Sequence, residues 1–312
     1  MGVVGGGYFG QFHLEKYLKI DGVELVGVAD TDPSRCREIA KQYPVQTFSH
    51  HSDLFGKVQS VSIAVPTPFH HTIARDFFLH GVDVLLEKPI ASTLEEADEL
   101  IALAESNGLI LQIGHLERFN GALLAVEGMI QNSFLIECQR QAPFLRRGAD
   151  VDVVLDLMVH DIDIVLNLFN SKIKHLDANG SSVLTPHFDV ANAQIEFENG
   201  CTAKLTASRV SKEKTRNMRI FQSDGTWMID YLSQKASFSK KVDRPEKGPL
   251  SEMVAEEIPV RKTDLLEAEI RSFLQSVRDR KEAKVSGRDG RQALDIALRI
   301  IQNMKEKHHP KA

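Results

Sequence analysis

The sequence predicts a chain with two α/β parts: a doubly wound parallel sheet, followed by an α+β domain with an open, mainly antiparallel sheet. Up to about residue 118, short β-branched runs alternate with helical segments, which is typical of a parallel sheet covered by helices on both faces. Beyond that point, Asn199-Gly200 and Asp224-Gly225 separate apolar runs as hairpin turns do. With 312 residues and 42% hydrophobic content, the chain can bury one large core or two ordinary ones.

The first domain, residues 1–118, alternates strands and helices along the chain. The opening residues up to Val4 form its first strand, and the further predicted strands are 24–29, 45–48, 60–65, 82–86 and 109–113. The predicted helices are 11–20, 33–43, 69–80 and 92–107. Gly81 and Gly108 follow two of these helices, where a glycine commonly ends a helix.

The second domain, residues 119–312, has a different pattern. Its predicted helices are 120–131, 151–169, 264–280 and 288–305, and its predicted strands are 134–141, 191–198, 201–208, 218–222 and 226–231. Residues 235–261 are polar and contain proline and glycine, so we interpret them as a surface excursion. The C-terminal helix, 288–307, could pack back on the first domain.

Composition and charge exclude several classes of protein. A net charge of −5 argues against a nucleic-acid scaffold or an anionic membrane partner, and no apolar run approaches the length that spans a bilayer. Three cysteines, far apart in the sequence, indicate reduced thiols and a cytoplasmic location. None of the twelve histidines has a metal-binding spacing with cysteines or carboxylates, so we assign no metal.

The opening strand runs into a G-x-G-x-x-G motif formed by Gly5, Gly7 and Gly10. The first glycine permits a tight turn, the second lets backbone N–H groups approach a pyrophosphate, and the third lets helix and strand pack closely. The motif alone is weak, but a helix and a second strand ending in an acid follow in the expected order. We therefore predict a Rossmann dinucleotide-binding domain, with Tyr8 and Phe9 also at the cofactor, rather than an unrelated tight turn.

Asp30 ends the second strand, where a carboxylate can accept hydrogen bonds from an adenosine ribose. The same carboxylate would repel a 2′-phosphate, which favours NAD over NADP. Arg35 is the nearest cation and is predicted on the following helix. The alternative role for Asp30, capping the turn into Pro33, is compatible with the same position.

Lys88 lies between Glu87 and Pro89 at the carboxyl end of the predicted strand 82–86. Ligands of doubly wound folds bind at these strand ends, so this position favours catalysis or substrate binding. The alternative is a solvated lysine whose stem covers apolar surface.

Asp156 and His160 are four residues apart in the predicted helix 151–169, which places them on one face. Asp163 continues that face and could orient the imidazole. The surrounding residues are strongly apolar, so both polar groups need partners or water. Histidine suits proton transfer near neutral pH, and the alternative is a structural His–Asp pair that satisfies itself.

Other candidate residues follow the ends of predicted elements. Pro66, Thr67 and His70 come after the strand 60–65 and are predicted to line the cofactor. Arg118 and Asn120, at the predicted domain boundary, could bind substrate. A basic cluster lies on or near one strand and is either a solvated face or a phosphate-binding patch: Arg209, Lys214, Arg216 and Arg219.

These motifs resemble those of the Gfo/Idh/MocA oxidoreductases along nearly the whole chain. The motifs that carry the resemblance are Gly5-x-Gly7-x-x-Gly10, Pro66-Thr67-Pro68-x-His70, Glu87-Lys88-Pro89 and Asp156-x-x-x-His160-Asp161-x-Asp163. The resemblance implies that Lys88, Asp156 and His160 are the catalytic set and that Glu87 and Lys88 also contact the cofactor. It further implies a cis peptide bond before Pro89, which would aim Lys88 at the substrate.

The implied activity is hydride transfer between a secondary alcohol of a sugar ring and NAD. Residues 146–166 and 117–120 look like those of members that oxidise the 3-hydroxyl of a nucleotide-linked N-acetylglucosamine, with Asp163 and Arg209 among the substrate-binding residues. One alternative is a dehydrogenase of a free sugar or an inositol, and another is a non-catalytic NAD-binding sensor. The resemblance also implies a homodimer or homotetramer assembled through the sheet of the second domain.

Overall fold

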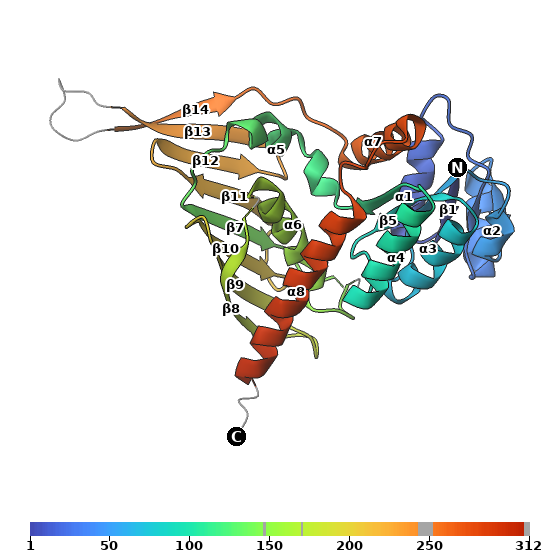
Figure 1. The fold of residues 1–312 in the computed structure, drawn as a ribbon, viewed down its shortest axis with the longest axis horizontal. Helices are drawn as coiled ribbons and strands as arrows, with labels where there is room; N and C mark the ends of the chain where they lie inside the picture. The colour runs from blue at the N-terminus through green and yellow to red at the C-terminus, as the bar shows by residue number, and fades with distance from the viewer. Residues whose placement is uncertain (146–147, 170, 243–251, 309–312) are drawn as a thin grey trace. The chain divides into compact units, whose positions relative to one another are not determined.

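The computed structural model describes residues 1–145, 148–169, 171–242 and 252–308 (Figure 1). The chain forms two compact units. Unit 1 contains residues 1–116 and 264–294, and unit 2 contains residues 117–263 and 295–312. The chain therefore leaves unit 1 and later returns to it, whereas the division expected from the sequence assigned everything after residue 118 to the second domain.

Unit 1 is built on a six-stranded sheet in the order β3-β2-β1-β4-β5-β6, and its strands run parallel. The strands are β1 (Gly2–Val4), β2 (Gly27–Ala29), β3 (Gln46–Phe48), β4 (Ser60–Ile63), β5 (Asp83–Glu87) and β6 (Leu111–Gly114). The strand order reverses between β1 and β4, which is where doubly wound folds bind ligands at the carboxyl ends of their strands. The predicted fold of the first domain is confirmed.

Helices cover both faces of this sheet. The described helices are α1 (Tyr8–Tyr17), α2 (Pro33–Gln42), α3 (His70–Leu79), α4 (Leu94–Ser106) and α7 (Leu265–Asp279), with short 3-10 turns η1 (His51–Leu54) and η2 (Thr67–Phe69). α1 packs against α7, and α3 packs against α4. Figure 1 shows these two pairs on opposite sides of β5.

α7 belongs to unit 1 because its apolar face completes the core of that unit. Ile270 and Phe273 are fully buried and share one cluster with Leu14 and Tyr17 of α1. The apolar periodicity of residues 264–280 predicts this helix correctly. Periodicity shows that a face is covered, however, and it does not show which element covers it.

Unit 2 is built on an eight-stranded sheet in the order β14-β13-β12-β11-β7-β10-β9-β8. The strands are β7 (Leu135–Gln141), β8 (Ile173–Ser181), β9 (Val190–Phe197), β10 (Thr202–Ser208), β11 (Thr215–Phe221), β12 (Gly225–Asp230), β13 (Lys235–Val242) and β14 (Glu252–Ile258). Among the described strands, β7 and β10 form the parallel pair, and the other neighbours are antiparallel. The predicted mainly antiparallel sheet is confirmed.

One face of the unit 2 sheet is covered and the other is open. The remaining described elements are η3 (Leu116–Phe119), α5 (Gly121–Val126), η4 (Glu127–Met129), the π-helical segment η5 (Val154–Met158), α6 (Val159–Leu168) and α8 (Gly287–His308), whose first residues belong to unit 1. α5 and α6 lie on the same side of the sheet (Figure 1). Along β10, Ala203 and Leu205 are buried, whereas Lys204 between them is exposed, as expected for a sheet with one solvated face.

Both predicted hairpins form, but their glycines have different roles. Gly200 has φ +88°, and the N–H of Phe197 donates to the carbonyl oxygen of Cys201 (2.9 Å), so Gly200 lies in the turn. Gly225 instead begins β12. A Cβ on Gly225 would lie 2.5 Å from the ring of Phe238 in β13, so close strand packing requires this glycine.

The expectation for residues 235–261 is wrong, and one strand of unit 2 was not predicted. The surface excursion over 235–261 contains the paired strands β13 and β14, although residues 243–251 lie outside the described ranges. These strands are rich in lysine, serine and glutamate and are mostly half-buried or exposed, and an ion pair between Lys240 and Glu256 (2.5 Å) joins them. β8 was not predicted, because this edge strand shows a weak alternation of buried and exposed residues.

Candidate active site

The glycine loop connects β1 to α1. Gly5 has φ +95°, and a Cβ on it would lie 2.5 Å from the carbonyl oxygen of Ala64. A Cβ on Gly10 would lie 1.7 Å from the carbonyl oxygen of Gly5, because strand and helix approach closely here. Within the described chain, a Cβ on Gly7 would meet Arg35 alone, at 3.9 Å. Gly7 therefore borders open space, where a phosphate group can approach the backbone.

The N-terminus of α1 borders the same space. Gly7 is its N-cap residue, and among the described residues no side chain caps the helix and no acid occupies its first turn. Such a helix end attracts an anion, because its first N–H groups lack intrahelical acceptors. Tyr8 is exposed with its ring edge-on to Phe12 (4.8 Å between centroids), and Phe9 is half-buried.

Asp30 is buried at the end of β2, and both of its carboxylate oxygens accept hydrogen bonds. The N–H of Gly6 donates to Oδ2 (2.7 Å), and the N–H of Asp32 donates to Oδ1 (2.8 Å). Arg35, on α2 as predicted, forms an ion pair with Oδ2 (3.1 Å). Asp30 thus orders the turn into Pro33, which is the alternative role expected for it. Its remaining lone pairs are compatible with a ribose contact.

Lys88 follows β5 at the carboxyl end of the sheet and is half-buried. The Lys88–Pro89 peptide bond is cis, as the family resemblance implies. The preceding Glu87 is 8% exposed, and its carboxylate is hydrogen-bonded to His13 of α1 (2.9 Å). Sequence reasoning missed His13, although it lies three residues after the glycine motif.

His70 is buried at the start of α3 and contacts two backbone carbonyl groups. Its Nδ1 lies 2.8 Å from the oxygen of Pro89, and its Nε2 lies 2.9 Å from the oxygen of Val65. Burial lowers the pKa of His70. The turn that His70 holds includes Pro66, which is exposed, and Thr67, which is half-buried. A cofactor contact by the His70 side chain stays a prediction.

Asp156 and His160 lie in a helix that begins with a π turn rather than in the uninterrupted α-helix expected over 151–169. The π-helical segment Val154–Met158 leads directly into α6. A π turn inserts an extra residue and is frequent at functional sites, and here it alters the direction in which Asp156 projects relative to His160. Both side chains are half-buried. The Asp156 carboxylate packs against Gly148, where an added Cβ would lie 2.8 Å from Oδ2.

Three of the predicted substrate residues, Arg118, Asn120 and Asp163, have structural partners. Arg118 donates to Asp163 through Nε (2.7 Å) and a terminal nitrogen (2.9 Å), and both side chains are almost fully buried. Bidentate pairs of this kind are strong and directional. Asn120 caps α5 by accepting from the N–H of Ala122 (3.1 Å). Their contact with a substrate stays a prediction.

A buried ion network that sequence reasoning missed lies beside α6. Arg140 of β7 is 1% exposed and donates to both oxygens of Asp161 (2.8 and 3.0 Å) and to Glu117 (2.9 Å). Arg216 of β11 also donates to Glu117 (3.2 Å). Asp161 directly follows His160, so this network fixes α6 to the sheet at the candidate base.

Arg209 at the end of β10 is 3% exposed and is surrounded by acceptors of the protein. Its Nε donates to Asp189 (2.7 Å), and one terminal nitrogen donates to the carbonyl oxygens of Gly148 (2.5 Å) and Val151 (2.8 Å). These bonds hold the segment before the π turn. They favour a structural role for Arg209, and its contact with a substrate stays a prediction.

The basic cluster expected over 209–219 does not form one patch. Arg216 and Arg219 lie three residues apart in β11, so they project from opposite faces of the sheet. Arg216 joins the buried network, whereas Arg219 pairs with Glu137 on the open face (2.5 Å). The interpretation of these residues as a single phosphate site is therefore wrong.

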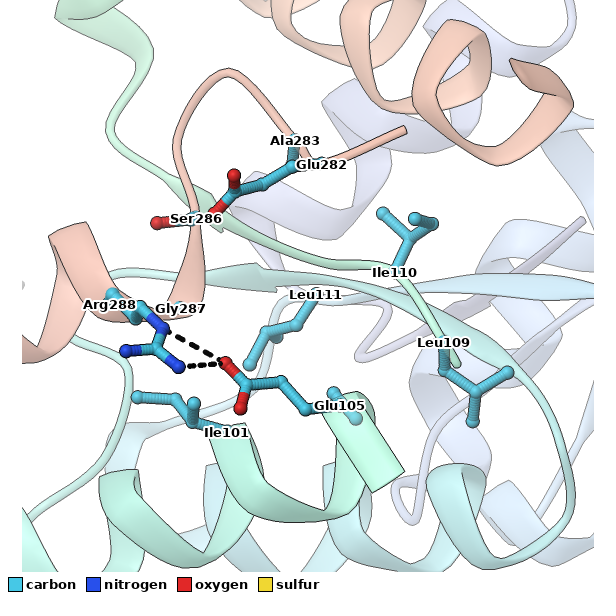
Figure 2. A pocket seen from close by; sticks show the side chains of 11 residues that line it. Ile101, Glu105, Leu109, Ile110, Leu111, Glu282, Ala283, Ser286, Gly287 and Arg288 are labelled. Carbon is cyan, nitrogen blue, oxygen red and sulfur yellow. Dashed lines mark hydrogen bonds and ion pairs between the residues drawn. The ribbon is translucent and has the colours of Figure 1, made fainter. Parts of the chain in front are cut away.

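Within residues 1–145, 148–169, 171–242 and 252–308, no group of three or more His, Cys, Asp or Glu side chains could hold a metal ion, and no helix is long and apolar enough to cross a membrane. Figure 2 shows a small hollow in unit 1 between α4, β6 and the start of α8, where Arg288 pairs with Glu105 (2.7 Å). None of the predicted site residues lines this hollow.

Two family models match most of the chain. Residues 1–115 match a model described as an oxidoreductase family with an NAD-binding Rossmann fold, and residues 117–228 match the GFO/IDH/MocA C-terminal domain. The chain belongs to the Gfo/Idh/MocA oxidoreductase family. It is therefore an NAD-dependent oxidoreductase, and the prediction of its family, enzyme class and cofactor is confirmed.

Several members of the Gfo/Idh/MocA family are similar to this chain. The UDP-N-acetylglucosamine 3-dehydrogenase of Acidithiobacillus ferrooxidans is 35% identical over 301 residues, which cover 96% of this chain and 95% of that protein. A solved structure of that enzyme has a TM-score of 0.90 at 34% identity and covers 97% of both chains. The inositol 2-dehydrogenase of Rubrobacter xylanophilus is 30% identical over 178 residues, 52% of this chain and 50% of that protein.

Proposed function

We propose that this protein oxidises the 3-hydroxyl of UDP-N-acetylglucosamine with NAD as the oxidant. The observation that carries the proposal is the 35% identity to UDP-N-acetylglucosamine 3-dehydrogenase over 96% of this chain. This similarity extends through unit 2, and so it is not explained by a shared NAD-binding fold alone.

Lys88, Asp156 and His160 supply the proposed acid–base chemistry. His160 accepts the proton of the sugar hydroxyl, because a neutral imidazole is a base near neutral pH. Lys88 donates a hydrogen bond to the same oxygen and stabilises its developing negative charge. Asp156 orients the imidazole and the substrate. Bound NAD supplies the hydride acceptor for the carbon that is oxidised.

The residues of the glycine loop fit NAD. Gly7 leaves space beside the uncapped N-terminus of α1, which suits a pyrophosphate. Asp30 places a carboxylate at the end of β2, where it would accept from ribose hydroxyls and repel a 2′-phosphate. Five further residues at or near this edge complete the proposed cofactor contacts: Tyr8, Phe9, Pro66, Thr67 and Glu87.

The first experiment measures NADH absorbance after NAD is added with UDP-N-acetylglucosamine, and in parallel with free N-acetylglucosamine, other free sugars and inositols. A carbonyl trap or a coupled aminotransferase pulls an unfavourable equilibrium. NADH formed with the nucleotide sugar and not with the free polyols supports the proposal. NADH formed with free polyols alone contradicts the substrate and retains the chemistry.

Substitutions test the assigned roles. Lys88→Met and His160→Asn should each lower kcat by about 10²–10⁴-fold, since each removes a group that moves or stabilises charge in the reaction. NAD binding, measured by fluorescence titration, should remain. Lys41→Met, at an exposed position of α2, is the matched control. Unchanged turnover in His160→Asn, or loss of NAD binding in Lys88→Met, would contradict the assignment.

A second candidate function is oxidation of a free sugar or inositol. The similarity to inositol 2-dehydrogenase favours it, as does the separation of Arg216 from Arg219, which removes the expected diphosphate patch. The same assay distinguishes the two candidates. NAD binding without turnover of any polyol would instead favour the non-catalytic sensor.

We also propose a homodimer or homotetramer assembled through the open face of the unit 2 sheet, and a cytoplasmic location. That face carries polar side chains such as Lys204 and Gln139, which could form a hydrophilic interface. Light scattering would measure the mass in solution, and Lys204→Glu should reduce it. Cell fractionation with an antibody would test the location.

A further inference from the structure

Two buried histidines contact the residues on either side of Lys88. His13 on α1 contacts Glu87, and His70 at the start of α3 contacts Pro89. Their exposed fractions are 0% and 1%. α1 and α3 cover opposite faces of the unit 1 sheet (Figure 1), so the two contacts reach the segment from opposite sides.

On the α1 side, hydrogen bonds link four groups in a chain, Glu87, His13, Ser62 and Tyr17. A carboxylate accepts and does not donate, so Nε2 of His13 donates to Oε1 of Glu87 (2.9 Å). Nδ1 of His13 lies 3.2 Å from the hydroxyl oxygen of Ser62, and the hydroxyl of Tyr17 lies 2.6 Å from that oxygen. Burial raises the pKa of Tyr17, so its phenol keeps its proton. Contacts at both ring nitrogens fix the orientation of His13.

The position of Glu87 is also fixed by the neighbouring strand. Glu87 at the end of β5 pairs with Gly114 at the end of β6. A Cβ on Gly114 would lie 2.8 Å from Oε2 of Glu87. The glycine therefore leaves the space in which the carboxylate reaches His13.

On the α3 side, His70 separates the turn after β4 from the turn after β5. The oxygens of Val65 and Pro89 lie at its two ring nitrogens, 2.9 and 2.8 Å away. Carbonyl oxygens only accept, so a neutral ring donates to one of them and an imidazolium donates to both. In either form the buried ring occupies the space between the turns and holds their separation.

We infer that His13 and His70 are positioning residues that set the direction of Lys88 by holding Glu87 and Pro89 from opposite faces of the sheet. The inference rests on the proposed function, because it takes Lys88 as the catalytic lysine. A lysine side chain is flexible and its ammonium is a point charge, so fixing its two neighbours limits where it projects. A displacement of about 1 Å in a reacting geometry can lower a rate about 100-fold.

The kinetic test compares His13→Ala and His70→Ala with His71→Ala. His71 adjoins His70 on α3 but pairs with the exposed Glu99 (2.9 Å), so it controls for loss of a histidine from the same helix. We expect kcat to fall about 10–100-fold in the first two variants, with little change in the KM for the sugar. The His71→Ala variant should match the unaltered enzyme.

A conservative variant and an independent one separate positioning from folding. The amide of His13→Gln can still donate to Glu87 and accept from Ser62, so it should recover part of the lost kcat. Gly114→Ala should lower kcat as His13→Ala does, because it displaces Glu87 without altering the histidine. A structural role alone would lower the unfolding temperature and leave kcat per folded enzyme unchanged, which would overturn the inference.

A second readout needs no substrate. The rate at which a lysine-selective acylating reagent modifies Lys88, followed by mass spectrometry of its peptide, reports the surroundings of the ammonium. This rate should change in His13→Ala and His70→Ala and remain the same in His71→Ala. Identical rates in all three would overturn the inference even for an active enzyme. If the unaltered protein oxidises no sugar, the proposed function fails, whereas the modification rates still decide the inference.

Discussion

Glu269 on α7 is an acid in the core of unit 1. It is fully buried, and among the described residues neither of its carboxylate oxygens has a hydrogen-bond partner. Burial, together with the nearby Glu87, raises its pKa well above the ordinary value of 4.5. The folded protein therefore holds a proton that the unfolded chain releases above about pH 4.5, and stability falls by up to about 1.4 kcal/mol per pH unit until the folded pKa is reached.

Glu269→Gln should stabilise the protein by a margin that grows with pH, because the amide has no proton to lose. Urea unfolding at about pH 5 and about pH 8 would measure this margin. Glu257→Gln, at an exposed position of β14, serves as the control. An equal margin at both pH values would show that Glu269 titrates as an exposed acid does.

Arg209→Met should lower the free energy of unfolding by about 3–5 kcal/mol, because it leaves the buried Asp189 without its cation. The same variant should leave the KM for the sugar unchanged if Arg209 is structural. Urea unfolding and initial rates would measure the two effects. A raised KM with unchanged stability would instead assign Arg209 to the substrate.

Single residues were predictable where their position in an element defines their role. The position of Lys88 after a buried strand was predictable, as was the close approach of helix and strand at Gly10. Partners distant in sequence were not predictable. His13 and Glu87 are 74 positions apart, and Arg118 and Asp163 are 45 positions apart. A sequence shows that such charged residues need partners, but it does not identify them.

At the scale of the element, we expect different glycines of the glycine loop to serve packing and NAD binding. Gly10→Ala should destabilise unit 1, since its Cβ would overlap the backbone of Gly5. Gly7→Ala should fold normally and bind NAD more weakly, since its Cβ enters the space beside α1. Thermal unfolding and NAD titration of the two variants would distinguish these effects. Equal loss of stability in both variants would contradict the different roles.

Strands and helices with a clear apolar period were predicted to within a few residues. β8, β13 and β14 were missed because their side chains are largely polar or exposed, and the π turn before α6 has no signature in the apolar pattern. Arg140 is a charged residue whose burial the apolar pattern did not reveal. It follows Ile136 and Cys138 on the buried face of β7. The period of two places Arg140 on that face, but we interpreted the segment as an ordinary strand.

At the scale of the whole molecule, the sequence predicted two domains and their sheet types. It suggested a return to the first domain for the C-terminal helix 288–307 alone, whereas the whole segment 264–294 belongs to unit 1. We expect a fragment of residues 1–118 to lack stable tertiary structure, because Ile270 and Phe273 of α7 complete its core. Near-ultraviolet circular dichroism and proteolysis would test the fragment. Adding a peptide of residues 262–294 should restore protection, and a stable fragment without it would contradict this role of α7.

The return of the chain also affects how the protein is made. Unit 1 is interrupted after residue 116 and resumes at residue 264. At roughly 5–20 residues per second, a ribosome needs about 7–30 s to synthesise the intervening stretch of about 150 residues. During that interval the nascent Rossmann sheet exposes the apolar surface that α7 will cover. We therefore expect the first third of this protein to need protection from aggregation until α7 has been translated.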